Sequence, residues 1–180
     1  MMRDLFKEIY DQYHQDLYRF IFYMVKDQHL TEDLVQDVYI KVIQSYETFQ
    51  GKSSQKTWLF SIARHVTIDY FRKQGRRKKV VQSSVSIDES SDMIHDNQPL
   101  PDEILEAKEE VKELYHLLDF CTEDQKMVLI LRYIQQLSIK ETADILNWSE
   151  SKVKTTQHRG INRLKEKMND LKEGDESETI

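Results

Sequence analysis

Apolar residues recur three or four positions apart through most of the chain, which is the spacing of helices that bury one face. Between residues 3 and 26 this pattern is almost unbroken. The apolar positions there are Leu5, Phe6, Ile9, Tyr10, Tyr13, Leu17, Phe20, Ile21 and Met24. We therefore predict a long first helix with one buried face.

A second helix is predicted to begin at Thr31. Threonine is a favourable N-cap, and Glu32 and Asp33 then lie in the first turn, where the helix dipole favours negative charge. The apolar stripe of this helix comprises Leu34, Val35, Val38, Val42 and Tyr46. Its opposite face carries Asp33, Gln36, Asp37, Ile40 and Gln44. A third helix is expected to begin near Ser54.

The helical pattern stops in the middle of the chain. The stretch "QSSVSIDESSDMIHDNQ" is rich in serine and aspartate, and Pro99 and Pro101 follow it. The predicted segments are an N-terminal domain (1–79), a linker (80–101), a C-terminal domain (102–172) and an acidic tail (173–180). With only 4 glycines and 2 prolines, the chain does not suit a turn-rich β-sandwich. The predicted fold is all-α: two small helical domains joined by a flexible acidic linker, the second containing a helix-turn-helix.

Local signals place the helices of the C-terminal domain. An opening helix is expected at about 103–119. Thr122 with Gln125, and Ser138 with Glu141, have the spacing of capping boxes, so each pair predicts a helix start.

The stretch "SIKETADILNWSESKVKTTQHRG" fits a helix-turn-helix position by position. Ala143 is the small residue where two helices approach closely, Asn147 takes the left-handed turn, and Val153 anchors the second helix. Ser149 caps that helix, which is expected at about 150–170. Its early exposed surface comprises Ser151, Lys152, Lys154, Thr155, His158 and Arg159. A plain helical hairpin with a charged face is the alternative interpretation.

Charge is distributed unevenly along the chain. The formal net charge is -6, yet residues 64–79 hold seven basic residues and one acid, and residues 152–167 hold six and one. Between them, residues 83–113 hold ten acids and two lysines. Two basic regions of this kind indicate contacts with nucleic-acid phosphates, while the acidic stretch suits a solvated spacer.

Aromatic and basic side chains share one edge of the third helix. An arc beside its apolar face carries Trp58, His65, Asp69 and Arg72. This combination suits stacking on unpaired bases together with phosphate contacts. The preceding loop, "FQGKSSQK", offers a glycine, small hydroxyls and two lysines that could hold a nucleotide outside its stack. The alternatives are that Trp58 is a core residue and that Asp69 is an intrahelical ion-pair partner.

Other chemistries are not indicated. The four glycines form no phosphate-cradling loop, and the six histidines show no HExxH or paired metal spacing. Cys121 is the single cysteine, which excludes a disulfide framework and fits a reducing cytoplasm. The opening "MMRDLFKEIYDQ" has charges where a signal peptide has its apolar run. We expect a cytoplasmic protein that is not an enzyme, with no cofactor, metal or small-molecule substrate.

Three motifs occur in order: "TEDLVQDVYIKVI", "FQGKSSQKTWLFSIARHVTIDYFRK" and "SIKETADILNWSESKVKTTQHRGINRLKEKM". Together they resemble the extracytoplasmic-function (ECF) sigma factors of RNA polymerase, over nearly the whole chain from Leu5 to about Leu171. The resemblance implies a two-domain protein that binds core RNA polymerase, directs it to promoter DNA and leaves once transcription is under way. It also implies a membrane-anchored anti-sigma factor as a partner.

The resemblance assigns residues to three binding sites. Polymerase binding would use Asp33, Gln36, Asp37 and Ile40. Capture of the minus-ten element as single-stranded DNA would use Gly51, Lys52, Ser53, Ser54, Lys56, Trp58, Arg64, His65, Arg72 and Lys73. Reading of the duplex minus-thirty-five element would use Ser151, Lys152, Lys154, Thr155, His158 and Arg159. The chain departs from the family pattern at His65, often Asn, and at Gly160 and Ile161, often Ala and Arg.

Two rival functions would use only part of these features. A stand-alone helix-turn-helix regulator needs a sensor or dimer surface, and the first domain shows no ligand-pocket pattern. An RNA-binding module built on residues 49–79 would leave the helix-turn-helix unused. Co-purification with core RNA polymerase would distinguish these functions from that of a sigma factor.

Overall fold

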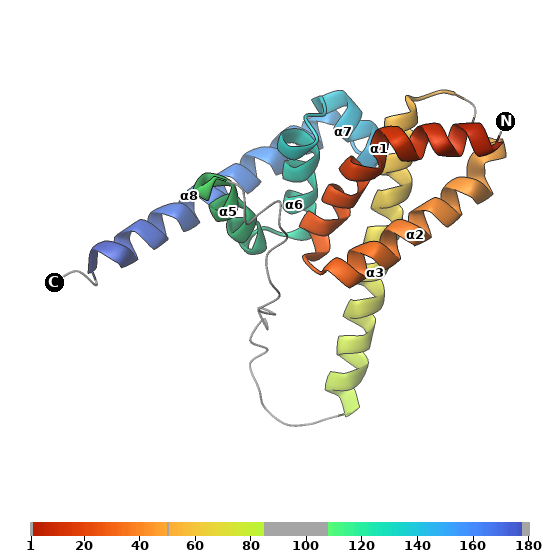
Figure 1. The fold of residues 1–180 in the computed structure, drawn as a ribbon. Coiled ribbons are helices and arrows are strands. Elements are labelled where there is room, and N and C mark those ends of the chain that lie inside the picture. Colours follow the sequence, from red (N-terminus) through yellow and green to blue (C-terminus); the bar gives the residue numbers. More distant parts are fainter. Residues whose placement is uncertain (1, 50, 85–107, 178–180) are drawn as a thin grey trace.

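A computed structural model describes residues 2–49, 51–84 and 108–177 of the chain. Every regular element within these residues is helical, which confirms the predicted fold class (Figure 1). The N-terminal bundle consists of α1 (Met2–Val25), α2 (Gln28–Ser45), the 3-10 turn η1 (Tyr46–Thr48) and α3 (Gln55–Ser84). The C-terminal unit consists of α5 (Glu109–Leu117), η2 (Leu118–Phe120), α6 (Glu123–Leu129), η3 (Ile130–Ile134), α7 (Ile139–Leu146) and α8 (Glu150–Ser177).

The N-terminal bundle is held together by apolar side chains from its three long helices. The rings of Phe20 on α1 and Phe60 on α3 lie 5.5 Å apart, and both side chains are fully buried. The predicted stripe of α1 is buried or half-buried except for Tyr10, which is 42% exposed. The Tyr10 ring belongs to an aromatic cluster between α1 and α2 that comprises Phe6, Tyr10, His14 and Tyr39.

The start of α2 differs from the sequence prediction. Asp27 is the N-cap, because its carboxylate accepts a hydrogen bond from the backbone N–H of Leu30 at 2.8 Å. Thr31 lies fully buried in the first turn, and its hydroxyl donates to the carbonyl oxygen of Asp27 at 2.6 Å. Lys26 has a left-handed backbone with φ of 54°, which ends α1 and brings Asp27 into the capping position. The prediction of Thr31 as the cap was therefore wrong.

The predicted caps of the C-terminal unit are confirmed. Thr122 and Ser138 both complete capping boxes, and the hydroxyl of Ser149 accepts the backbone N–H of Lys152 at 3.2 Å. Asn147 ends α7 in the left-handed conformation, with φ of 55° and ψ of 45°. The segment η3 that follows α6 is π-helical, and its widened turn is closed by the bond from Gln135 N–H to the carbonyl of Ile130 at 2.9 Å.

Helix α3 extends beyond the bundle. Its C-terminal end projects away from the other helices, and residues 75–80 are all exposed (Figure 1). The helix ends at Ser84, so the first five residues of the predicted linker, 80–84, are helical. The remainder of the predicted linker, and residues 103–107 of the expected opening helix, lie outside the described residues.

The two halves of the chain pack against each other. Helix α7 lies against α3, and α1 contacts both α6 and η3. The Lys26 ammonium forms an ion pair with Asp119 at 2.8 Å and donates a hydrogen bond to the carbonyl oxygen of Tyr115. Gln135 reaches across in the other direction and donates to the carbonyl oxygen of Asp16 at 3.0 Å.

Candidate nucleic-acid and polymerase interfaces

The outer face of α2 is open to solvent. All four residues predicted to bind polymerase (Asp33, Gln36, Asp37 and Ile40) are exposed. Ile40 is 52% exposed, and Ile43 one turn later is 46% exposed, so the acids border an apolar strip. Ile43 was missed in the sequence, although its spacing of three residues from Ile40 would have revealed it.

The loop before α3 is arranged around its helix cap. The Ser54 hydroxyl accepts the backbone N–H of Thr57 at 3.1 Å, while Lys52 and Ser53 remain exposed. Gly51 has φ of +65°, a conformation that favours glycine over other residues. The loop is thus a tight, polar turn that directs small side chains outward.

Trp58 has both an inner and an outer contact. Its ring packs against the hydrophobic core and is half-buried, so the core alternative was partly right. The other contact is the ring of Phe49, with centroids 4.6 Å apart and planes inclined by 31°. Phe49 therefore enlarges the aromatic surface beside the loop. The sequence analysis missed it because it lies outside the helical pattern.

Lys56 and Arg64 are less accessible than their neighbours on α3. The Lys56 ammonium lies 3.4 Å from the Asp16 carboxylate. Arg64 is half-buried, and its Nε has no hydrogen-bond partner among the described residues. Burial lowers the pKa of the Arg64 guanidinium, and Asp124 on α6 partly offsets this effect. Acids from α1 and α6 therefore face two cations that the sequence assigned to DNA.

The remaining residues of the predicted minus-ten surface are exposed. The His65 ring is fixed by Nδ1, which donates to the carbonyl oxygen of Ser61 at 2.7 Å and leaves Nε2 on the outer side. Arg72 and Asp69 form a loose, well-exposed pair at 4.0 Å, as the alternative interpretation of Asp69 expected. Such exposed pairs contribute little stability, so Arg72 is available to an anion. Lys73 is also exposed.

The helix-turn-helix has the geometry that its sequence predicts. Ala143 and Val153 are buried between the helices. The six residues assigned to DNA reading (Ser151, Lys152, Lys154, Thr155, His158 and Arg159) are all exposed. Two of them are held by neighbours that the sequence did not reveal: the Lys152 ammonium lies 3.7 Å from the centroid of the Trp148 ring, and His158 Nε2 accepts from the Asn162 side-chain amide at 3.1 Å.

Arg132 supports the recognition helix from behind. Its Nε donates to Gln157 Oε1 at 2.8 Å, and its Nη1 donates to the carbonyl oxygen of Leu137, just before the cap of α7. Because Arg132 lies on η3, one side chain connects three successive elements. Short π-helical segments often occur at functional positions, and here the segment orients this guanidinium.

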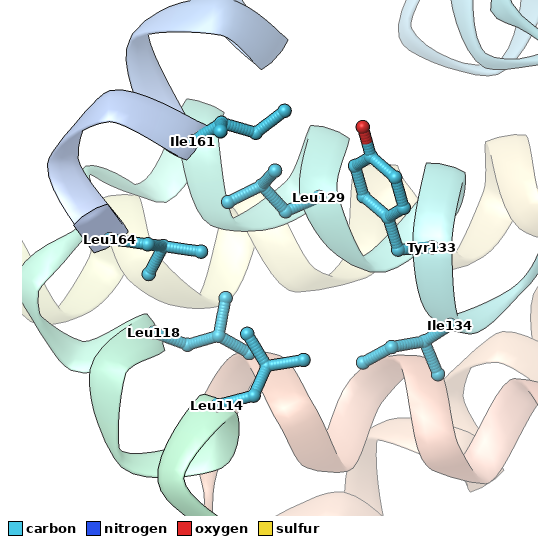
Figure 2. A pocket seen from close by; sticks show the side chains of 7 residues that line it. All are labelled: Leu114, Leu118, Leu129, Tyr133, Ile134, Ile161 and Leu164. Carbon is cyan, nitrogen blue, oxygen red and sulfur yellow. The ribbon is translucent and has the colours of Figure 1, made fainter. Parts of the chain in front are cut away.

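An apolar cavity of about 230 Å³ lies behind the same helix (Figure 2). It is lined by Leu114, Leu118, Leu129, Tyr133, Ile134, Ile161 and Leu164. Gly160, next to Ile161, is buried, and a Cβ at this position would lie 3.0 Å from Leu129 Cδ1. An alanine at this position, where the family often has one, would therefore press on the Leu129 side chain unless that side chain shifted.

Family models match both halves of the chain. The model "Sigma-70 region 2" matches residues 9–77, and "Sigma-70, region 4" matches residues 113–164. The ECF RNA polymerase sigma factor SigX of Bacillus subtilis is 55% identical over 172 residues, covering 96% of this chain and 88% of that protein. SigM of the same organism is 35% identical, covering 88% of this chain and 91% of that protein.

The chain belongs to the ECF sigma factors. As a sigma factor, it binds core RNA polymerase and directs it to promoters, and this family is not a class of enzymes. The two-domain match excludes the rival functions, because each of these used one half of the chain only. Region two of this sigma factor corresponds to the α1–α3 bundle, and region four contains the helix-turn-helix.

Solved structures share the arrangement of both regions. The sigma factor RpoE from Bartonella quintana, solved with the anti-sigma factor NepR, superimposes with a TM-score of 0.70 over 91% of this chain and 96% of that one, at 24% identity. CnrH, solved with the cytosolic domain of CnrY, gives a TM-score of 0.66 over 93% of this chain and 89% of that one, at 16% identity. At these identities the likeness concerns the fold alone.

Two further properties of this sigma factor concern the described residues only. None of their helices is long and apolar enough to cross a membrane. They contain no group of side chains that could hold a metal ion. Cys121 is half-buried, and burial raises the pKa of its thiol, which disfavours the reactive thiolate.

Proposed function

We propose that this ECF sigma factor uses three separate surfaces to bind polymerase, the minus-ten element and the minus-thirty-five element. The exposed face of α2 around Asp37 and Ile40 docks on core polymerase. The loop at residues 51–54 and the outer stripe of α3 capture the minus-ten element as single-stranded DNA. The N-terminal turns of α8 enter the major groove of the minus-thirty-five duplex.

The geometry of α8 supports this division most directly. Val153 fixes one side of the helix in the protein, while Ser149 caps its N-terminus. The opposite side exposes lysine, arginine and histidine in the first turns, which can donate hydrogen bonds to base-edge acceptors. Lys152 and His158 are already oriented by Trp148 and Asn162, which reduces the entropy lost on binding.

Two residues of the minus-ten surface need a rearrangement before they contact DNA. Lys56 is paired with Asp16, and Arg64 is half-buried opposite Asp124. DNA phosphates would compete with these acids for the same cations. We therefore assign first contact with the minus-ten strand to the exposed residues around Trp58 and Arg72.

A protein partner restrains the sigma factor in this proposal. RpoE and CnrH, which share the fold, were solved with NepR and with the cytosolic domain of CnrY, respectively. By extension, a membrane-anchored anti-sigma factor holds this protein at the inner face of the membrane until a signal releases it into the cytoplasm. Co-expression with a tagged candidate, followed by co-purification, tests this extension.

Charge reversal on α2 tests polymerase docking. Asp37→Lys should weaken binding to core polymerase about ten-fold, because like charges at an interface impede association. The matched control is Asp11→Lys, the same charge change at an exposed position of α1. Affinity is measured by pull-down of core enzyme at moderate salt, and transcription from a cognate promoter reports function. Equal binding by both variants would contradict docking through α2.

A further inference from the structure

The outer end of α3 carries six basic side chains, and only one of them forms an ion pair with another described residue. These residues (Arg72, Lys73, Arg76, Arg77, Lys78 and Lys79) are all exposed. In the described part of the chain, the ion pair of Arg72 with Asp69 at 4.0 Å is the only one that involves this group. No acid follows Asp69 within α3. Among the described residues, the projecting end of the helix is thus a concentrated positive charge whose only ion-pair partner is Asp69.

Helical spacing places two of these cations in line with the minus-ten surface. Trp58, His65 and Arg72 are seven residues apart, so they form one stripe along α3. Arg76 and Lys79 follow Arg72 by four and seven residues and therefore continue the same stripe.

Two of the three remaining cations, Arg77 and Lys78, lie on a different side of the helix. Arg77 follows the half-buried Tyr70 by seven residues, and Lys78 follows the buried Thr67 by eleven. Both therefore continue the side of α3 that faces the bundle in its first half. They provide a matched pair with the same charges as Arg76 and Lys79.

We propose that Arg76 and Lys79 bind backbone phosphates of the promoter duplex that adjoins the opened minus-ten segment. This inference rests on the proposed function of the stripe. From Arg72 to Lys79 the helix rises about 10 Å, which corresponds to about three base-pair steps of B-form DNA. The contact would extend the captured region onto neighbouring duplex and hold its edge during opening.

The chemistry of this end favours phosphates over bases or lipid. Residues 72–79 contain no aromatic ring, so they offer no surface on which an unpaired base could stack. They contain no apolar side chain either, whereas helices that lie in a membrane surface bury an apolar face. Regularly spaced cations alone suit the repeated charges of a nucleic-acid backbone, and they would bind without base preference.

The test compares two double variants in the full-length protein assembled with core polymerase. Promoter affinity is measured between about 50 mM and about 200 mM salt for wild type, R76A/K79A and R77A/K78A. Loss of two phosphate contacts should lower the slope of log affinity against log salt by about 1.8. When salt rises across this range, the affinity of R76A/K79A should therefore fall about twelve-fold less than the affinity of wild type. R77A/K78A should follow wild type, and circular dichroism should show all three folded.

A second arm locates the contact on the DNA. On a single-stranded minus-ten oligonucleotide without adjoining duplex, R76A/K79A should bind as well as wild type. Three results would overturn the inference: equal slope changes in both double variants, a defect that persists on the single strand, or an unchanged DNA slope with lost binding to phosphatidylserine vesicles. The proposed function of the stripe itself fails in a different way, because wild-type holoenzyme would then not bind the single-stranded minus-ten oligonucleotide.

Discussion

The ammonium of Lys26 lies 2.8 Å from the carboxylate of Asp119, joining the end of α1 in region two to the segment after α5 in region four. The same ammonium lies 4.1 Å from the centroid of the Tyr115 ring. Burial lowers the pKa of Lys26, and its hydrogen bond and charge interaction with Asp119 oppose that effect. Together with the packing of α7 against α3, this contact holds the two regions in one arrangement.

The promoter requires a different arrangement. The minus-ten and minus-thirty-five elements lie about 25 base pairs apart, or about 85 Å of duplex. In this structure, however, α7 of the helix-turn-helix lies directly against α3, the helix that carries the predicted minus-ten stripe. The two regions must therefore separate when both elements are bound.

Lys26→Met should favour separation in the free protein. The change keeps apolar contact with Tyr115 but removes the ion pair, which should cost about 1 kcal/mol, or about five-fold in the equilibrium between joined and separated regions. Lys126, 3.6 Å from Asp119, limits the effect. Small-angle scattering should report a larger radius of gyration than for wild type or for Lys41→Met, a control at an exposed position of α2. An unchanged radius would show that the ion pair does not hold the regions together.

Trp58→Ala should impair promoter opening more than duplex binding. Stacking on one unpaired base contributes about 1–3 kcal/mol, so open complexes on duplex promoters should fall about ten-fold or more. A pre-melted bubble should rescue the variant. Trp58→Phe retains a ring beside Phe49 and should lose less. Equal defects of Trp58→Ala on both templates would mean that the residue serves only the core.

Substitutions of Arg159 and Lys167 should distinguish a side chain that reads a base from one that does not contact bases. Arg159 is exposed in the early turns of α8, whereas Lys167 pairs with Asp170 at 3.3 Å and lies near the Phe120 ring. Loss of a base contact costs about 1–3 kcal/mol of discrimination at one base pair. Arg159→Ala should therefore change the preferred minus-thirty-five sequence, while Lys167→Ala leaves it unchanged.

The measurement for this pair is holoenzyme binding to single-base promoter variants at two salt concentrations. Uniform weakening of every promoter variant by Arg159→Ala, with a salt slope lower by about one unit, would instead assign Arg159 to a phosphate.

His14 should make the fold less stable in mild acid. Its Nδ1 lies 3.0 Å from the Tyr39 hydroxyl within the aromatic cluster, and burial lowers the pKa of its imidazole. The unfolded chain therefore binds the proton more readily, and the free energy of unfolding falls as pH drops below the ordinary histidine value of about 6.5. Urea midpoints at about pH 7.5 and about pH 5.5 bracket this change.

Substitution identifies the responsible histidine. His14→Gln should reduce the loss of stability between the two pH values, whereas His29→Gln, at an exposed position, should behave like wild type. Glu141 does not confuse the comparison, because hydrogen bonds from Ser138 lower the pKa of its carboxyl, and its titration lies below this window. An identical acid response in wild type and His14→Gln would exclude His14 as the cause.

The sequence by itself determined the helices and most of their ends. Capping by Thr122, Ser138 and Ser149 depends on bonds within three residues, and the turn at Asn147 on the backbone of one residue. Such interactions depend only on residues that are close in sequence, and so do the exposed stripes of α2, α3 and α8, so both can be predicted from the sequence. The misplaced start of α2 shows the limit, because Asp27 and Thr31 both have capping side chains and the turn at Lys26 decided between them.

Only the tertiary structure decided which charges are already occupied. The Lys56 ammonium pairs with the carboxylate of Asp16, 40 residues away in the sequence, and the Lys26 ammonium donates to the carbonyl oxygen of Tyr115, 89 residues away. Gly160 likewise lies against the Leu129 side chain on another helix. No local pattern encodes these neighbours, because they depend on how whole helices pack, and packing is set by the combined shape of many side chains. The sequence therefore predicted which cations suit DNA, and helix packing, within region two for Lys56 and between the regions for Arg64, determined which of them already face an acid.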